Sequence, residues 1–452
     1  MSALSWVQPP DLLAHELVAS AAEGRPVEDV RRRWAAAGGV VDAPRAGLAQ
    51  PGDDALRALA TELLAELASL PVDPAVLRDE PEDLAAIEEL WGLGRDAAVP
   101  RDTGDLLDRL HGAWLGRAAG CLLGKPVEKI PREGIREILL SQGRWPLDDW
   151  FTAAGLPAEV AARWPWNRRS APTSLAENID GMPEDDDLNF ALIALRVLED
   201  HGRDFTTDDV AASWLADLPG GRGFTAERVA YRNLLLGESA PRTATRDNPY
   251  REWIGAWIRT DVYGWVNPGD PAAAARMAHR DARLSHVRNG VYGAMAVAAM
   301  CAVAVVADDV GQVLDAGRAA VPPASRCAEA LALGVDLAAA GLDTEAALDV
   351  LHERYADLHW VHVLNNAALT AYALASSGGD LGAGISAAVT GGWDTDSVGA
   401  TVGSVLGALG GARALPARWT EPLHDRLASS LPGCDGLTFT DLAARTSALV
   451  QR

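Results

Sequence analysis

Two stretches of the chain repeat glycine at every fourth position, and this repeat constrains the fold more than any other feature. Each glycine inside a helix costs about 1 kcal/mol relative to alanine, so the repeats imply a compensating gain. Residues four apart share one helix face, and a face without side chains admits a close neighbour. We therefore expect the two helices to pack against each other. The glycines are Gly112, Gly116, Gly120 and Gly124 in the first stretch and Gly399, Gly403 and Gly407 in the second.

The remaining pattern predicts an all-α protein. Apolar residues recur at helical spacing along most of the chain, and no stretch longer than a few residues alternates with the period of a strand. The longest uncharged run, Val291 to Ala307, is short and is followed by two aspartates, which favours a buried core helix over a membrane span. We expect a compact bundle of many helices packed at steep angles.

The chain of 452 residues divides by composition near residue 104. Residues 1–104 have helical spacing interrupted by Gly and Pro but hold no concentration of reactive groups, which predicts a helical extension that packs on the main body or on a partner. Residues 105–452 hold all the candidate chemistry and are expected to form the catalytic domain. Within them, residues 145–174 are rich in Trp, Pro and Arg without a period, as expected for a long surface loop or lid.

The charge and the ends of the sequence limit the partners. The net charge of -23 disfavours nucleic acid and anionic membranes, because phosphate groups would be repelled. The four cysteines lack the spacing of a zinc site or a disulfide framework. No signal peptide is recognised at the N-terminus, so we expect a cytoplasmic location.

A first acidic cluster precedes the second glycine series, in the stretch Gly391-Gly392-Trp393-Asp394-Thr395-Asp396-Ser397. Two carboxylates and a hydroxyl at the start of a helix suit a hard cation such as Mg²⁺, Mn²⁺ or Ca²⁺. The alternative is an acidic first helical turn that the helix dipole favours. The stretch alone leaves both interpretations open.

A second acidic cluster, Glu184-Asp185-Asp186-Asp187, lies between Pro183 and an apolar helix predicted over 188–198. Four consecutive acids repel one another, and the helix dipole relieves only part of that repulsion. Such a run is often a solvated surface, but this position between a proline and an apolar helix favours a bound divalent cation. If the two clusters converge, they form one site with at least five oxygen ligands and two cations.

The stretch 106–411 resembles the ADP-ribosylglycohydrolase family, whose relatives include dinitrogenase reductase-activating glycohydrolase. The first glycine series with Glu128 is similar to the first family motif, and the two acidic clusters are similar to its Thr-Asp-Asp-Thr and Gly-Asp-Thr-Asp-Thr motifs. Gly255-Ala256-Trp257-Ile258-Arg259 resembles a Gly-rich ligand loop, and Leu284-Ser285-His286 falls where the family has a Thr-His pair. All five motifs occur in the family's order.

The resemblance implies an all-α fold around a binuclear centre of two Mg²⁺ or Mn²⁺ ions, and hydrolysis at C1 of an ADP-ribosyl ribose. Glu128, Asp186 and Asp396 would be catalytic, with Glu128 as the acid or base. The metal ligands would be Glu184, Asp185, Asp186, Asp394, Asp396 and Ser397, and the substrate would be held by Gly255, Trp257, Arg259 and His286. For His286, a role as a satisfied core histidine is the alternative.

Several positions depart from the family pattern. Cys121 stands where the first motif often has Asp, Glu184 replaces a neutral Thr, and Trp393 is inserted before Asp394. The register of the acidic run is therefore open by one residue, so that Asp187 can replace one of the predicted ligands.

These departures keep metal binding as the expectation and leave the substrate open between an ADP-ribosylated protein and a small ADP-ribosyl or nucleoside-like compound. Two alternatives remain. One is a non-catalytic protein that binds an ADP-ribose-type ligand and contacts a partner through residues 1–104, and the other is a dinuclear hydrolase of phosphoesters.

Overall fold

The computed structural model describes residues 4–42, 46–47, 54–94 and 105–450, and within these ranges the chain is helical without a β-strand. The all-α prediction is therefore confirmed. None of the helices in these ranges is long and apolar enough to cross a membrane. The run Val291 to Ala307 belongs largely to a buried helix, α16 (Arg288–Ala304), as predicted.

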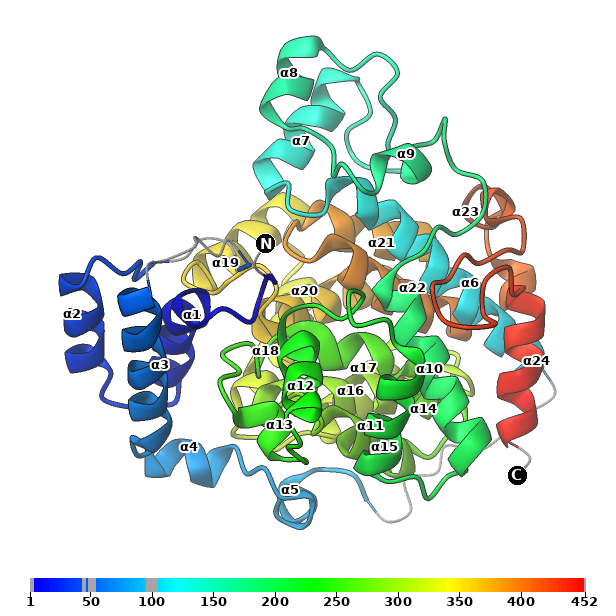
Figure 1. Cartoon of the computed structure of the whole chain (residues 1–452). Coiled ribbons are helices and arrows are strands. Elements are labelled where there is room, and N and C mark those ends of the chain that lie inside the picture. Colours follow the sequence, from blue (N-terminus) through cyan, green and yellow to red (C-terminus); the bar gives the residue numbers. More distant parts are fainter. Residues whose placement is uncertain (1–3, 43–45, 48–53, 95–104, 451–452) are drawn as a thin grey trace.

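The extension forms a group of helices at one side of the molecule, drawn in blue in Figure 1. Prolines begin two of its helices, and the side chains of Asp73 and Asp83 cap two N-termini. The helices are α1 (Pro9–Ala22), α2 (Glu28–Ala36), α3 (Asp54–Ser69), α4 (Pro74–Asp79) and α5 (Leu84–Leu90).

The two glycine series form the central helix pair of the body, α6 (Leu106–Gly124) and α22 (Thr395–Gly410), and the prediction that they pack together is confirmed. A Cβ added to Gly116 would lie 2.1 Å from the carbonyl oxygen of Gly403, and one added to Gly112 would lie 2.2 Å from that of Gly407. Only helices without side chains at these points can approach so closely.

The other helices surround this pair. Above it in Figure 1, a lobe of α7, α8 and α9 spans the predicted loop or lid, which thus includes two short helices. The lobe consists of α7 (Arg132–Ser141), α8 (Ala158–Arg163) and α9 (Ala171–Ser174). The helices below and beside the central pair are α10 (Asp186–His201), α11 (Thr207–Asp217), α12 (Thr225–Leu235), α13 (Arg242–Thr245), α14 (Asp261–Trp265), α15 (Pro271–Ala282), α16, α17 (Val310–Ala319) and α18 (Arg326–Ala339). The remainder are α19 (Thr344–Arg354), α20 (Val363–Ser376), α21 (Leu381–Thr390), α23 (Ala417–Thr420) and α24 (Phe439–Val450), with 3₁₀ turns η1 (Lys125–Val127), η2 (Ile254–Arg259), η3 (Ala412–Ala414) and η4 (Glu421–Leu423).

The extension is joined to the body by buried ion pairs. Glu23 accepts from Arg251 at 2.7 Å and also pairs with Arg288, while Glu80 makes two contacts with Arg326, at 2.7 and 2.8 Å. Burial alone would raise the pKa of Glu23, but the arginines outweigh it and the pKa is lowered. Through these pairs the extension contacts the main body.

Candidate metal and catalytic site

The two acidic clusters meet at the N-termini of α10 and α22. Asp185 is the N-cap of α10 and Asp394 is the N-cap of α22. The Ser397 hydroxyl donates to Oδ2 of Asp187 across 3.3 Å, which joins residues 210 positions apart. Both helices direct the positive ends of their dipoles at the same group of carboxylates. The predicted convergence of the clusters is therefore present in the fold.

The glycine contact fixes where α22 begins relative to the end of α6. A Cβ on Gly124 would lie 2.2 Å from the carbonyl oxygen of Thr395. The Thr395 hydroxyl donates in turn to the Gly124 carbonyl oxygen at 2.9 Å. Because α6 ends here, the chain leaves it beside the carboxylates, and Glu128 follows within four residues.

The carboxylates of the cluster strongly disfavour one another's ionisation. Burial, with the nearby negative charges of Asp185, Asp396 and Glu128, raises the pKa of Asp186 well above its ordinary value. Burial and Asp396 do the same for Asp394. For Asp396, burial and then Glu128 raise the pKa to about 7. The fold thus gathers more negative charge than the surrounding side chains balance.

Two buried cations balance part of this charge. Burial alone would raise the pKa of Asp185, but the adjacent Lys125 ammonium outweighs it, and the pKa is lowered. Arg117 lies on α6, pairs with Asp261 at 3.0 Å and donates to the Asp187 carbonyl oxygen at 2.7 Å. Oδ1 of Asp187 is buried without a hydrogen bond among the described residues, and the nearest guanidinium nitrogen is 3.5 Å away.

Glu128 stands at the edge of the cluster and is held by two donors. Asn167, from the lobe above the site, donates to Oε2 at 2.6 Å, and the Lys129 ammonium lies 2.7 Å from Oε1. The side chain of Glu128 keeps partial exposure at 18%. The lobe therefore orients a carboxylate that both solvent and the acidic cluster can reach.

Glu184, a predicted metal ligand, lies apart from the cluster. Its carboxylate pairs with Arg222 at 2.7 Å and accepts from Asn189 at 3.1 Å. The residue precedes the N-cap of α10, so its side chain leaves the helix in another direction than those of Asp186 and Asp187. The structure thus favours the register in which Asp187 takes its place.

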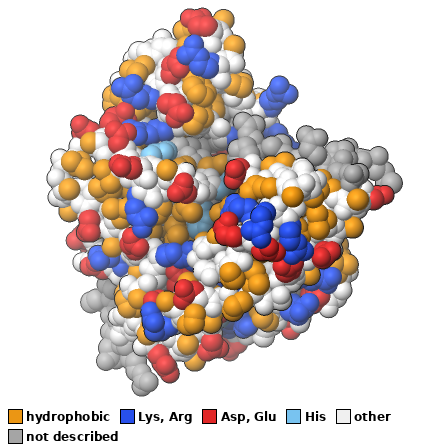
Figure 2. Space-filling model, turned by 90° about the vertical axis from the view of Figure 1, so that its left-hand side faces the viewer, with side chains coloured by type: hydrophobic (Ala, Val, Ile, Leu, Met, Phe, Trp, Pro, Cys, Tyr) orange, Lys and Arg blue, Asp and Glu red, His pale blue; other side chains and the backbone are white. Residues whose placement is uncertain are grey.

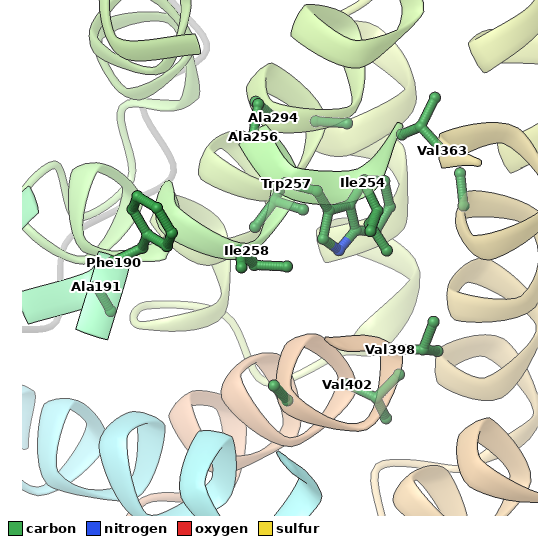
Figure 3. Packing of buried hydrophobic residues seen from close by; sticks show 14 of the residues in the cluster. Phe190, Ala191, Ile254, Ala256, Trp257, Ile258, Ala294, Val363, Val398 and Val402 are labelled. Atoms are coloured by element: carbon green, nitrogen blue, oxygen red, sulfur yellow. The ribbon is translucent and has the colours of Figure 1, made fainter. Parts of the chain in front are cut away.

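The segment predicted to hold substrate forms η2, and its side chains are buried. Trp257 donates to the Thr401 hydroxyl at 2.7 Å and packs among residues of α16, α20 and α22 (Figure 3). A Cβ on Gly255 would meet the Glu227 carboxylate at 2.2 Å. Both residues thus pack against the core that supports α22.

Arg259 is also internal, at 1% exposure. It donates to Glu227 and to the Ser285 hydroxyl at 2.7 and 2.8 Å, and it pairs with Asp281. All its nitrogens have partners within the chain, so none is left for a phosphate in this conformation. In this structure Arg259, the last residue of η2, therefore has an internal supporting position and not the predicted contact with substrate.

His286 joins the same internal cluster. Its Nδ1 lies 2.8 Å from the Ser285 hydroxyl, and its Nε2 has no hydrogen bond among the described residues. Burial, and then the charge of Arg259, lower the pKa of His286 well below its ordinary value. The imidazole is therefore neutral, and this burial agrees with the alternative of a core histidine.

Cys121 lies inside the site, one helical turn before Lys125. Ligand atoms of Cys121, Asp185 and Asp187 lie within 4.8 Å of one another, an arrangement that could hold a metal ion. Burial, followed by the charges of Asp185 and Asp187, raises the pKa of the Cys121 thiol well above its ordinary value. The residue thus adds a neutral thiol where a carboxylate was expected.

Sequence reasoning missed the residues that hold the site in place. Asn366 accepts from the Asp394 backbone N–H at 3.3 Å and donates to the Trp360 carbonyl oxygen at 2.8 Å. Lys125 and Asn167 were also missed. A lysine at the end of an apolar, glycine-rich helix was the one available signal, because such a charge requires a partner.

Comparisons with known proteins identify the family of the chain. A sequence model of the family described as ADP-ribosylglycohydrolase matches residues 102–451. Among curated proteins, no sequence gives a significant match. One similar solved structure, titled "ADP-ribosylglycohydrolase-related protein complex", is 22% identical, with a TM-score of 0.47 over 77% of this chain and 99% of that chain. Because the family match spans most of its length, the chain belongs to the ADP-ribosylglycohydrolase family.

Proposed function

We propose that this protein hydrolyses the glycosidic bond at ribose C1 of an ADP-ribosyl compound, at a divalent metal site between α10 and α22. The observation that carries the proposal is the meeting of two helix N-termini at one group of carboxylates, with Glu128 beside them. Membership of the family supports the reaction class.

The donor set fits Mg²⁺ or Mn²⁺. Carboxylate and hydroxyl oxygens are the ligands that these ions prefer. The buried Oδ1 of Asp187 lacks a hydrogen-bond partner in the described chain, as expected of a ligand atom. When bound, the cations supply a template for ribose hydroxyls and an activated water. We propose two ions, held by Asp186, Asp187, Asp394, Asp396 and Ser397.

Glu128 would orient the attacking water and accept its proton. Asn167 and Lys129 each contact one oxygen of the carboxylate and thereby hold the side chain in place. Glycosidic cleavage develops an oxocarbenium-like charge at C1, and nearby carboxylates stabilise positive charge. A positioned base of this kind contributes roughly 10²- to 10⁴-fold to the rate.

Aromatic side chains beside the cluster favour a nucleotide-type ligand. Trp393, directly before Asp394, has a positive φ of 61° and stacks on His352 with centroids 4.2 Å apart. Such a backbone conformation is uncommon for a bulky residue and occurs where function requires it. Trp360 lies 5.8 Å from the Lys129 ammonium. On the side of the molecule that carries the extension, histidine side chains lie in a hollow (Figure 2).

The proposal is tested by incubating the protein with an ADP-ribosylated peptide and with a small ADP-ribosyl compound. Mass spectrometry of released ADP-ribose is the readout. Release with Mg²⁺ or Mn²⁺, and its loss in excess chelator, is the expected result. Full turnover in chelator contradicts the proposal. ADP-ribose binding by calorimetry without any product supports the alternative of a non-catalytic binding protein.

A further inference from the structure

Lys125 places an ammonium group inside the acidic site, against the carboxylate of Asp185. The lysine follows α6 directly and is only 6% exposed. Its Nζ donates to the Asp185 carboxylate and, at 3.2 Å, to the Glu184 carbonyl oxygen. Oδ1 of Asp185 accepts from the Asp187 backbone N–H at 2.9 Å, as the cap of α10. Both oxygens of Asp185 therefore have partners within the chain.

The carboxylates of Asp394 and Asp396 form no ion pair with a lysine or arginine of the described chain. Oδ1 of Asp396 accepts the backbone N–H of Ser397 at 3.1 Å. Arg117, the other buried cation, lies 3.5 Å from Oδ1 of Asp187 and has Asp261 as its nearer partner at 3.0 Å. Among the described carboxylates of the cluster, Asp185 is therefore the one that accepts directly from a buried ammonium.

The next inference rests on the proposed metal centre. We propose that Lys125 is a fixed cation that pairs with the Asp185 carboxylate in place of a divalent ion. A lysine ammonium is a compact point charge with three donors, so it can replace a cation at one carboxylate. Asp185 is then a capping and positioning residue. The metal is held only by the ligands proposed above, which do not include Asp185.

Calorimetric titration of Mn²⁺ tests this assignment without measuring catalysis. Asp185→Asn keeps the cap of α10, and we expect its Mn²⁺ affinity to differ from that of the wild type by less than about tenfold. Asp186→Asn removes a metal ligand, and we expect its affinity to fall by more than roughly 100-fold, the largest loss usual for residues that contact the ligands but not the metal. The double variant Lys125→Met/Asp185→Asn removes the pair together, keeps the net charge of the site and should bind Mn²⁺ like the wild type. Lys125→Met alone frees a carboxylate and should tighten binding.

The outcomes separate this inference from the proposed function. A loss of affinity in Asp185→Asn as large as in Asp186→Asn overturns the assignment of Lys125 while the metal centre stands. A wild-type protein that binds no Mn²⁺ rejects the metal centre and this inference together. Because Lys125→Met leaves a buried carboxylate unpaired, its folding is checked by circular dichroism; if it does not fold, Asp185→Asn and the double variant decide.

Discussion

Gly120 and Gly399 meet backbone to backbone at the centre of the molecule. A Cβ added to Gly120 would lie 1.9 Å from the carbonyl oxygen of Gly399, and one on Gly399 would lie 2.4 Å from that of Gly120. Neither contact can be relieved by rotating a side chain, because both partners are backbone atoms. This contact sets the spacing of α6 and α22, and α22 begins with the carboxylates Asp394 and Asp396.

We expect Gly120→Ala to destabilise the protein by about 1–3 kcal/mol or more, as overpacking of a rigid core does. Chemical denaturation measures the effect. Gly410→Ala, on the same helix pair, is the matched control, since its Cβ would have only Leu415 at 3.9 Å. Equal stability of the two variants would contradict the close packing of the pair.

Glu23 is the key residue of the contact between extension and body. Glu23→Ala leaves Arg251 and Arg288 buried without one of their carboxylates, and we expect a loss of roughly 3–5 kcal/mol in unfolding free energy. Asp29→Ala removes an exposed partner of Arg32 and should change stability by no more than about 0.5 kcal/mol. A similar small effect for both would show that the extension is only loosely attached.

The contribution of His362 to the stability of the folded state should fall as the pH drops below about 6.5. Burial lowers the pKa of His362 to about 4 from an ordinary value of 6.5. Between these values the unfolded chain binds a proton that the folded chain does not, so the unfolding free energy decreases as pH decreases. His362→Asn keeps an N-cap acceptor for α20, and its denaturation midpoints should depend less on pH. An unchanged pH slope in the variant would exclude His362 as the cause.

Much of the site was predictable because its signals are local. The four-residue glycine period implies a bare helix face, and the position of four acids between Pro183 and an apolar helix favours a bound cation. The partners of Arg259 were not predictable, since Glu227, Asp281 and Ser285 come from separate segments that only the fold brings together. The family resemblance therefore suggested a substrate contact for a guanidinium that the folded chain uses internally.

The extension was also predictable only in part. Its helices could be predicted from the spacing of apolar residues. The pairing of Glu80 with Arg326, 246 residues apart, could not be predicted because it depends on how the body folds. Likewise, Glu184 and Asp187 look alike within a run of four acids. Only the start of α10 at Asp186 decides which of them points toward Ser397.

Glu128→Gln should lower kcat for ADP-ribose release by about 10²- to 10⁴-fold, because the amide cannot accept a proton from water. Mn²⁺ affinity should stay close to that of the wild type, which separates a catalytic role from a ligand role. Glu133→Gln, an exposed change on α7, is the control. An unchanged kcat in Glu128→Gln would remove this residue from the proposed mechanism.

Electron paramagnetic resonance of bound Mn²⁺ tests the central claim most directly, because it reports whether the two acidic helices share the same ions. Asp186→Asn on α10 and Asp396→Asn on α22 are compared with the wild type at equal Mn²⁺, with folding confirmed by circular dichroism. We predict that each single variant loses most of the bound-ion signal of the wild type. A wild-type signal in either folded variant would contradict a site shared between α10 and α22.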